Sequence, residues 1–522
     1  MKTIARHVRE KARHLASHPL FTEWLEDPTL PPEQAFLFSP MAIDFVMGFR
    51  DLNLYWIIYP QPSNALEEGL NAHAREDATH SRLFLKDWVA LGLDEQLGWA
   101  PRDLYWWQTS EATFEGRRAD FELTRMVFEN PDPLLRFAII ESMEEAGNVF
   151  FRRTVPIIER LAARTGLDYP YYGRYHLHRE TGHLQNADER AFYGVTLPED
   201  RRSTAVRLVD RVFAIFDLHF TSWLGLARAR RDGSWRFEPA REGRANASLR
   251  PDRPKDVSHT FSFHHPSSPS GEWAALARAR TEAFASLWEA PFNVWLRSAP
   301  PGDFERVARI VLLQWVVDSW ACADWFLLDT TYATPSTPLE RGINRLSRLY
   351  ASEMNRRYVE WEHLRIDEVT GWSASQALAH FWLDERVEEM RAVFASLRRL
   401  TFRFPQPLYR YWIMKCFVRF GDAMMHSLGE ALRRSGVPEE SFPAFTGCAE
   451  RLHPDLPPDR EADEAIESIE SSPLAETDAA ILWEILEETR AQEAKRLAVS
   501  WSVVEEAPDN RNLRFPVRQG KP

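Results

Sequence analysis

Hydrophobic residues recur at helical spacing along nearly the whole chain, and no stretch alternates apolar and polar residues as a half-buried strand does. Prolines fall between the periodic stretches, as at 28–33, 59–64 and 129–134, where they punctuate helices. The most apolar stretch, 310–328, contains two aspartates and is typical of a buried helix rather than a membrane span. The pattern therefore predicts an all-α protein without a membrane segment.

The helical pattern is interrupted at about 230–273, where Arg, Pro, Ser and Gly dominate. This composition is typical of a linker, and 522 residues exceed what one hydrophobic core usually holds. We therefore expect a first domain at 1–228, a linker at 229–272, a second domain at 273–500 and a tail at 501–522.

The two expected domains resemble each other in sequence. The segments 66–94 and 339–367 share identical residues at a constant offset of 273. This regularity indicates an internal duplication with one helical domain per copy. The pairs that show the offset are Leu66 and Leu339, Gly69 and Gly342, Asn71 and Asn344, Trp88 and Trp361, Leu91 and Leu364, and Asp94 and Asp367. Further matches align 21–25 with 292–296 and 136–147 with 410–421.

A helix predicted over about 66–91 carries polar groups in the middle of its apolar face. His73, Asp77 and His80 follow one another at spacings of four and three residues, which places them on one side of the helix. Burying several ionisable groups together is costly unless they are paired or bind a cation. Glu76 lies close to the same face. The sequence therefore leaves open which of His73, Glu76 and Asp77 would complete a site with His80.

A second predicted helix repeats this arrangement with His176, Glu180 and His183. Both helices share the spacing His-x3-[Asp/Glu]-x2-His, which occurs nowhere else in the chain. The [Asp/Glu]-x2-His part is the unit with which helix bundles hold di-iron and di-manganese sites. His178 falls off this face, and we expect it in solvent.

A third predicted helix, at 137–151, lies between these two in sequence and offers Glu144 on an otherwise apolar stripe, with Glu141 one turn earlier. The three helices together bring four imidazoles and at least three carboxylates to one interior. This mixture suits iron or manganese, whereas structural zinc usually takes four ligands rich in thiolate. The predicted metal ligands are His73, Asp77, His80, Glu144, His176, Glu180 and His183.

The second copy has lost these groups. At the 273 offset the first-helix ligands become Leu346, Tyr350 and Glu353, and Glu144 falls on Val418 in the alignment of the later helix. We therefore expect no metal in the second copy, which would serve as a packing partner or as the surface of a homodimer.

At these residues the first half resembles the haem-oxygenase-like di-iron oxidases and oxygenases, over roughly residues 15–228. The resemblance implies a seven-helix bundle in which two Fe(II) ions, with Mn as an alternative, react with O₂. It also implies the oxidation of a small molecule in biosynthesis, amino-acid-like or fatty-acid-like, by C–C cleavage or by oxidation at N or C. The residues that carry the resemblance are His80 on the first core helix, Glu144 on the second, and His176, Glu180 and His183 on the third.

Composition and charge narrow the remaining choices. The chain has 64 basic and 77 acidic residues, a net charge of −13, which is opposite in sign to that of most nucleic-acid-binding proteins. Three cysteines form no disulfide framework, and the N-terminal segment lacks the apolar core of a secretory signal, so we expect a cytoplasmic protein.

Two other functions stay open: a ferritin-like di-iron carboxylate bundle, and a non-catalytic helical binding or scaffold protein.

Overall fold

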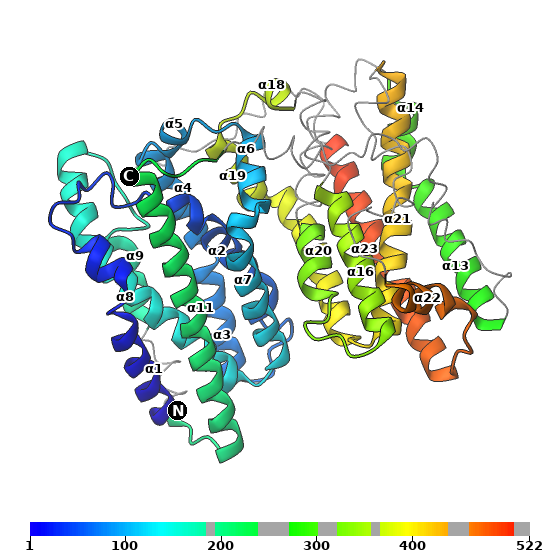
Figure 1. The fold of residues 1–522 in the computed structure, drawn as a ribbon, viewed down its shortest axis with the longest axis horizontal. Coiled ribbons are helices and arrows are strands. Elements are labelled where there is room, and N and C mark those ends of the chain that lie inside the picture. The colour runs from blue at the N-terminus through cyan, green and yellow to red at the C-terminus, as the bar shows by residue number, and fades with distance from the viewer. Residues whose placement is uncertain (184–193, 238–270, 301–320, 356–365, 437–458, 506–522) are drawn as a thin grey trace. The chain divides into compact units, whose positions relative to one another are not determined.

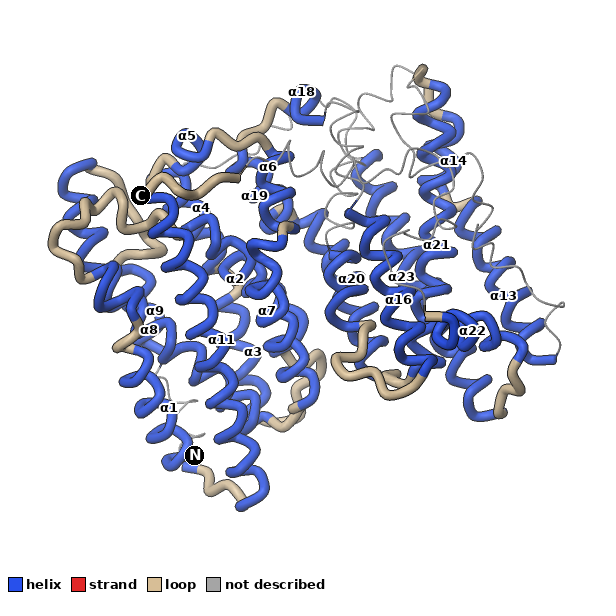
Figure 2. Tube along the Cα trace, in the orientation of Figure 1, coloured by secondary structure: helices blue, strands red, loops and turns tan. Residues whose placement is uncertain are grey.

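The computed structural model is helical in all the regions that it describes. The described residues are 1–183, 194–237, 271–300, 321–355, 366–436 and 459–505. Within these ranges every regular element is a helix and none is a strand (Figure 2). The predicted all-α class is therefore confirmed. No helix in these ranges is both long enough and apolar enough to cross a membrane.

The chain divides into two compact units, and the first contains residues 1–99, 107–238 and 373–383. Its framework consists of the long helices α1, α8 and α11, which pack against one another (Figure 1). Its helices from the first half of the sequence are α1 (Lys2–Leu15), η1 (Leu20–Leu25), α2 (Ser39–Asp51), η2 (Leu52–Ile57), α3 (Ala65–Asp77), α4 (His80–Ala90), α5 (Leu93–Leu97), α7 (Glu111–Glu129), α8 (Pro133–Thr165), α9 (Arg174–His183) and α11 (Glu199–Arg231).

The central helix α8 is defined by clear end signals. The side chain of Asp132 accepts a hydrogen bond from the backbone N–H of Leu134 at 2.9 Å, and Pro133 occupies the first turn, where no N–H is needed. At the other end Gly166 adopts a left-handed conformation with φ of 72°, which ends the helix. Glu144 therefore projects from the interior of a regular helix rather than from a loop.

The second unit contains residues 100–106, 239–372 and 384–522. Its long helices α21 and α23 pack against each other, and α13, α14 and α20 pack on this pair. Its helices are α13 (Gly271–Trp288), α14 (Pro291–Ser298), η3 (Trp325–Asp329), α16 (Pro338–Asn355), α18 (Ile366–Thr370), α20 (Glu385–Arg403), α21 (Pro407–Arg434), α22 (Arg460–Ser468), η6 (Ile469–Ser471) and α23 (Glu476–Glu505). Two helices complete the chain, α6 (Pro101–Thr109) and α19 (Ala374–Leu383).

The helix ends differ slightly from the expected domain limits. Helix α11 continues to Arg231 and α23 continues to Glu505, so each helix ends a few residues beyond the predicted boundaries at 228 and 500. Most of the predicted linker and tail, at 238–270 and 506–522, lies outside the described residues.

The single helix expected over 66–91 is divided, which corrects the prediction from the sequence. Helix α3 ends at Asp77 and α4 begins at His80. His73 and Asp77 therefore lie on one helix, and His80 begins the next.

The break between α3 and α4 is stabilised by side chains. The N–H and the hydroxyl of Thr79 both donate to the carbonyl of Glu76, at 3.1 and 2.8 Å, in place of continued helical bonding. Arg50 donates to the carbonyl of Ala78 at 3.1 Å, and Arg179 donates to the hydroxyl oxygen of Thr79 at 3.2 Å. Because both arginines are distant in sequence, the local hydrophobic pattern does not reveal this break.

Equivalent contacts occur in both units at the offset found in the sequence. Asn71 accepts a hydrogen bond from the N–H of Tyr59 at 2.7 Å and donates one to its carbonyl at 2.8 Å. Asn344 and Tyr332, each 273 residues later, form the same two bonds at 2.6 and 2.8 Å. Helices α3 and α16 are therefore joined to the segment that precedes each of them in the same way.

Other features repeat in the same region. The guanidinium of Arg136 lies 4.3 Å from the ring centre of Tyr59, and that of Arg410 lies 4.2 Å from the ring centre of Tyr332. The π-helical turns η2 and η3 begin at Leu52 and Trp325, again 273 residues apart. These local repeats support the internal duplication, which stays a prediction for the domains as a whole.

We expect Asn71→Ala and Asn344→Ala to destabilise the protein by similar amounts. Each change leaves one backbone N–H and one carbonyl without the amide partner, at a cost of about 2 kcal/mol. Chemical unfolding followed by tryptophan fluorescence measures the loss. A loss at Asn71 with none at Asn344 would contradict equivalent roles.

Candidate metal centre

Three of the predicted ligands meet in the first unit: His73 and Asp77 from α3, and Glu144 from α8. The Nε2 atom of His73 lies 3.0 Å from Oδ2 of Asp77 and 3.1 Å from Oε1 of Glu144. One ligand atom from each residue lies within 4.8 Å of the other two. Asp77 is 2% exposed and Glu144 is 6% exposed, so the carboxylates meet in the protein interior.

The spacing and chemistry of this triad fit a metal ion. Two ligands bound to one ion at about 2.1 Å and at right angles lie about 3 Å apart, which matches both distances from His73. Imidazole nitrogen and carboxylate oxygen are ligands that iron and manganese accept. The triad offers no thiolate of the kind that dominates structural zinc sites. His73, Asp77 and Glu144 are therefore suited to hold one ion.

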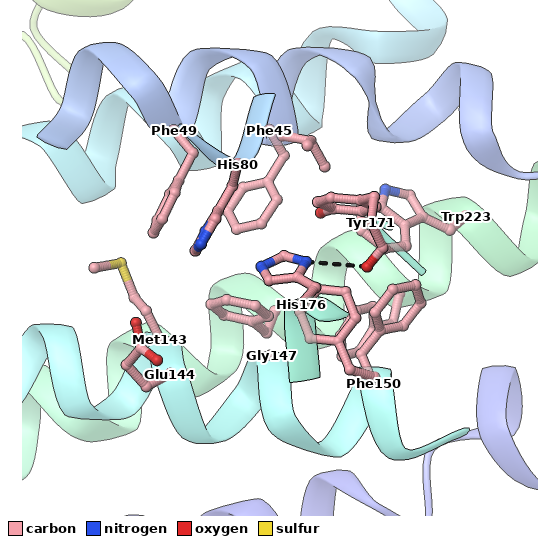
Figure 3. A pocket seen from close by; sticks show the side chains of 14 residues that line it. Phe45, Phe49, His80, Met143, Glu144, Gly147, Phe150, Tyr171, His176 and Trp223 are labelled. Carbon is pink, nitrogen blue, oxygen red and sulfur yellow. Dashed lines mark hydrogen bonds between the residues drawn. The ribbon is translucent and has the colours of Figure 1, made fainter. Parts of the chain in front are cut away.

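His80 and His176 form a second group in the same unit. Their ring centres are 4.1 Å apart, and the residues are 4% and 2% exposed. The Nδ1 atom of His176 lies 3.0 Å from the carbonyl oxygen of Tyr171 (Figure 3). Because a carbonyl only accepts, Nδ1 must be the donor, and in the neutral ring Nε2 keeps its lone pair. Metal-binding histidines are commonly oriented by such a bond.

A cavity of about 60 Å³ is bordered by His80, Glu144 and His176, whose side chains point toward a common space in Figure 3. The rest of its described wall is aromatic or aliphatic and contains no lysine or arginine. Glu144 thus belongs both to the triad and to the cavity that the two histidines border. The other wall residues are Phe45, Val46, Phe49, Met143, Gly147, Phe150, Phe151, Tyr171, Phe216, Phe220 and Trp223.

The segment before α9 is held by Asp87, which is fully buried on α4. Its two carboxylate oxygens accept hydrogen bonds from the N–H groups of Tyr171 and Tyr172, at 3.1 and 2.8 Å. Burial raises the pKa of Asp87 to about 8, although these two donors favour the ionised form. Since the carbonyl of Tyr171 orients His176, Asp87 links that imidazole to the helix that carries His80.

The contacts of Glu76 distinguish it from Asp77. The Nε and Nη2 atoms of Arg179 both lie 3.2 Å from Oε1 of Glu76, and the Glu76 side chain is 40% exposed. Asp77, in contrast, is buried beside His73. Among residues 73–77, His73 and Asp77 therefore face Glu144, and Glu76 pairs with arginine.

The remaining predicted residues are only partly described. Helix α9 extends to His183, but the side chains of Glu180 and His183 lie outside the described residues, so their role as ligands stays a prediction. His178 is exposed, as expected from its position off the helix face. Glu141 is buried on α8, one turn before Glu144.

The second unit has a different interior at the matching positions. Leu346 and Tyr350 are each 6% exposed, and the side chain of Glu353 lies outside the described residues. Among the residues described for this unit, no group of His, Cys, Asp and Glu has the spacing of a metal site. Lys415 and Glu470 form an ion pair at 2.6 Å. A positively charged side chain therefore lies inside this unit.

Comparisons with known proteins do not place the chain in a family. No protein-family model matches it, and no curated protein does. The likeness to haem-oxygenase-like di-iron oxidases therefore depends on the motif residues and stays a prediction.

Two residues that shape the centre were missed from the sequence, Asp87 and Arg179. Asp87 had a detectable signal, because it interrupts the apolar run of α4 seven residues after His80. Arg179 had none, since an arginine between two histidines on a polar helix is ordinary. Only the folded chain shows that it pairs with Glu76.

We expect Asp87→Asn to destabilise the first unit in a pH-dependent way. The amide oxygen can accept only one of the two N–H bonds, and the loss is about 1–3 kcal/mol. A carboxyl whose pKa rises from 3.8 to about 8 contributes stability that is complete below pH 3.8 and is lost as the pH rises through 8. The difference in unfolding free energy between wild type and variant should therefore narrow between pH 4 and 8. Urea unfolding across this range measures it, and a widening difference would contradict the raised pKa.

Proposed function

We propose that the first unit is a non-haem di-iron oxidase or oxygenase that uses O₂ to oxidise a small molecule. The observation that carries the proposal is the buried triad of His73, Asp77 and Glu144 beside a cavity that His80 and His176 also border. Bound Fe(II) would supply the electrons that reduce O₂, and Mn(II) is the alternative metal for this donor set.

Two groups of donors support two metal positions. His73, Asp77 and Glu144 would hold one ion, and His80 and His176 would contribute to the other. Glu144 borders both groups and is placed to serve either ion. Glu180 and His183 would complete the second set, as the sequence motif predicts.

The chain prepares its own donors for this role. The carbonyl of Tyr171 keeps the proton of His176 on Nδ1, so that Nε2 is the donor atom. Asp87 fixes that carbonyl through the backbone of Tyr171. Arg179 binds Glu76 and so keeps a further carboxylate away from the triad.

The cavity wall favours a substrate with an apolar part. Six of the fourteen residues that line the cavity are phenylalanine, and its acid and base side chains near neutral pH are Glu144, His80 and His176. About 60 Å³ accommodates several molecules of the size of water, which is room for O₂ and a short hydrocarbon segment. A fatty-acid-like substrate therefore fits this wall better than a charged amino-acid side chain does.

A ferritin-like centre is disfavoured by the break between α3 and α4. Ferritin-like bundles place a carboxylate and a histidine three residues apart on one continuous helix. Here Asp77 ends α3 and His80 begins α4. The aromatic cavity beside the ligands likewise favours an enzyme that admits an organic substrate.

Anaerobic titration should saturate at two Fe(II) per chain, and subsequent addition of O₂ should oxidise the iron and consume O₂. His73→Ala removes the imidazole between two carboxylates and should eliminate at least one metal position. His183→Ala and Glu180→Ala should each do the same at the second position. Iron analysis gives the stoichiometry, and an oxygen electrode gives the uptake.

Neighbouring residues provide matched controls for these variants. His178→Ala and Glu76→Gln should bind iron like the wild type, whereas Asp77→Asn should lose it. Equal behaviour of the His183 and His178 variants would refute the α9 ligand motif. A wild-type protein that binds no iron would refute the proposal and favour a non-catalytic helical protein.

A further inference from the structure

Helix α19 comes from the second half of the sequence but is packed within the first unit. It contacts α4, which carries His80, and α2, which carries Phe45 and Phe49 of the cavity wall. Its apolar face is buried in this position. The buried side chains are Ala374, Ala377, Leu378, Phe381 and Trp382.

The docking of α19 is specified at both of its ends. At its N-terminus the N–H and hydroxyl of Ser375 donate to the carboxylate of Asp94, at 3.0 and 2.5 Å. Asp94 also accepts a hydrogen bond from the indole N–H of Trp88 on α4, at 2.8 Å. Near its C-terminus the ring of Trp382 covers α2 at Gly48, where an added Cβ would lie 3.7 Å from the ring.

The matching segment of the first half is packed in the second unit. Residues 100–106 belong to that unit, and the N–H of Arg102 donates to the carboxylate of Asp367 at 3.1 Å. Asp367 lies 273 residues after Asp94, and Ser375 lies 273 residues after Arg102. The same backbone-to-carboxylate contact therefore occurs in each unit. In each unit the carboxylate comes from one half of the sequence and the N–H donor from the other half.

Helices α6 and α19 also begin in the same way. The N–H of Ala100 donates to the side chain of Asp103 at 3.0 Å, and the N–H of Ser373 donates to that of Gln376 at 2.9 Å. Ser373 and Gln376 lie 273 residues after Ala100 and Asp103, respectively. Reciprocal use of one contact by equivalent residues is the pattern of an isologous, element-swapped dimer.

From this reciprocity we infer that the second half of the chain is a structural component of the candidate metal unit, acting through α19. Ser375 and Trp382 are positioning residues, because they hold α4 and α2 without bordering the described cavity. Without α19, the apolar surface that it covers on α4 and α2 would be exposed. The effect on metal binding rests on the proposed function, whereas the support given to α4 and α2 does not.

The second half of the sequence, among whose described residues no metal-type cluster occurs, thereby has a role in the first unit. His80 begins α4, so its position depends on what packs along that helix. Phe45 and Phe49 depend in the same way on α2. A helix that contacts both can therefore fix one metal donor and one wall of the cavity together.

The full-length protein tests the inference with two tryptophan variants. Trp382 and Trp273 are both 5% exposed, and Trp273 lies in α13 of the second unit. Trp382→Ala should reduce hydrogen-exchange protection of α4 and α2 by about tenfold or more in metal-free protein. It should also weaken Fe(II) binding by about 10- to 100-fold. Trp273→Ala should change neither quantity in the first unit.

A pair of milder variants covers the case in which Trp382→Ala does not fold. Asp94→Ala removes the anchor of α19, and Asp367→Ala removes the equivalent anchor in the second unit. Asp94→Ala should reduce the protection of α19 and α4, and Asp367→Ala should leave both unchanged.

Hydrogen exchange tests the structural role of α19, and Fe(II) binding tests the proposed di-iron function. Unchanged protection of α4 and α2 in both first-unit variants would overturn the inference about α19. Reduced protection in a protein whose wild type binds no Fe(II) would support the structural role of α19 while refuting the proposed di-iron function.

Discussion

The first unit is organised by the need to keep two carboxylates and an imidazole together away from water. The imidazole of His73 lies within 3.1 Å of both carboxylates, and Asp77 is 2% exposed and Glu144 is 6% exposed. Burying several ionisable groups together is costly unless they are paired or bind a cation. The proposed metal ion would add a positive charge at this point.

The division between α3 and α4 gives this polar interior its two-part form. On one continuous helix, His80 would follow Asp77 along the same stripe. The turn at Thr79 instead separates the two helices, and His80 packs against His176 while His73 and Asp77 meet Glu144. One short stretch of sequence therefore supplies donors to two adjacent groups.

Sequence periodicity predicted the helices and the residues of the triad because both are local properties. The spacing of His73 and Asp77 requires one helix face, and Glu144 stands out within an apolar stripe. The break after Asp77 was not predictable, since it depends on Arg50 and Arg179 reaching backbone or hydroxyl oxygens there from distant segments. Asp77, and not Glu76, lies beside His73, and this difference involves the same arginine, because Arg179 pairs with Glu76.

The packing of α19 was beyond prediction for a related reason. A duplicated sequence is equally compatible with helices that stay in their own unit and with helices that are exchanged. Composition and periodicity are the same in both arrangements, because α19 would bury the same apolar face in either one. The difference appears only in contacts such as that of Ser375 with Asp94, across 281 residues of sequence.

The two units differ in the charged groups of their interiors. In the second unit Glu470 is held by Lys415 at 2.6 Å, and Arg280 lies 3.7 Å away, so the cations belong to the chain itself. In the first unit the imidazole of His73 lies beside the carboxylates of Asp77 and Glu144, a donor set that could hold a metal ion. The scaffold contacts of Tyr59 and Asn71 are repeated by Tyr332 and Asn344, so they do not depend on either interior. Metal binding by the first unit, as proposed, would therefore depend on a few buried side chains, and α19 from the second half of the sequence packs on the helix that begins at one of them, His80.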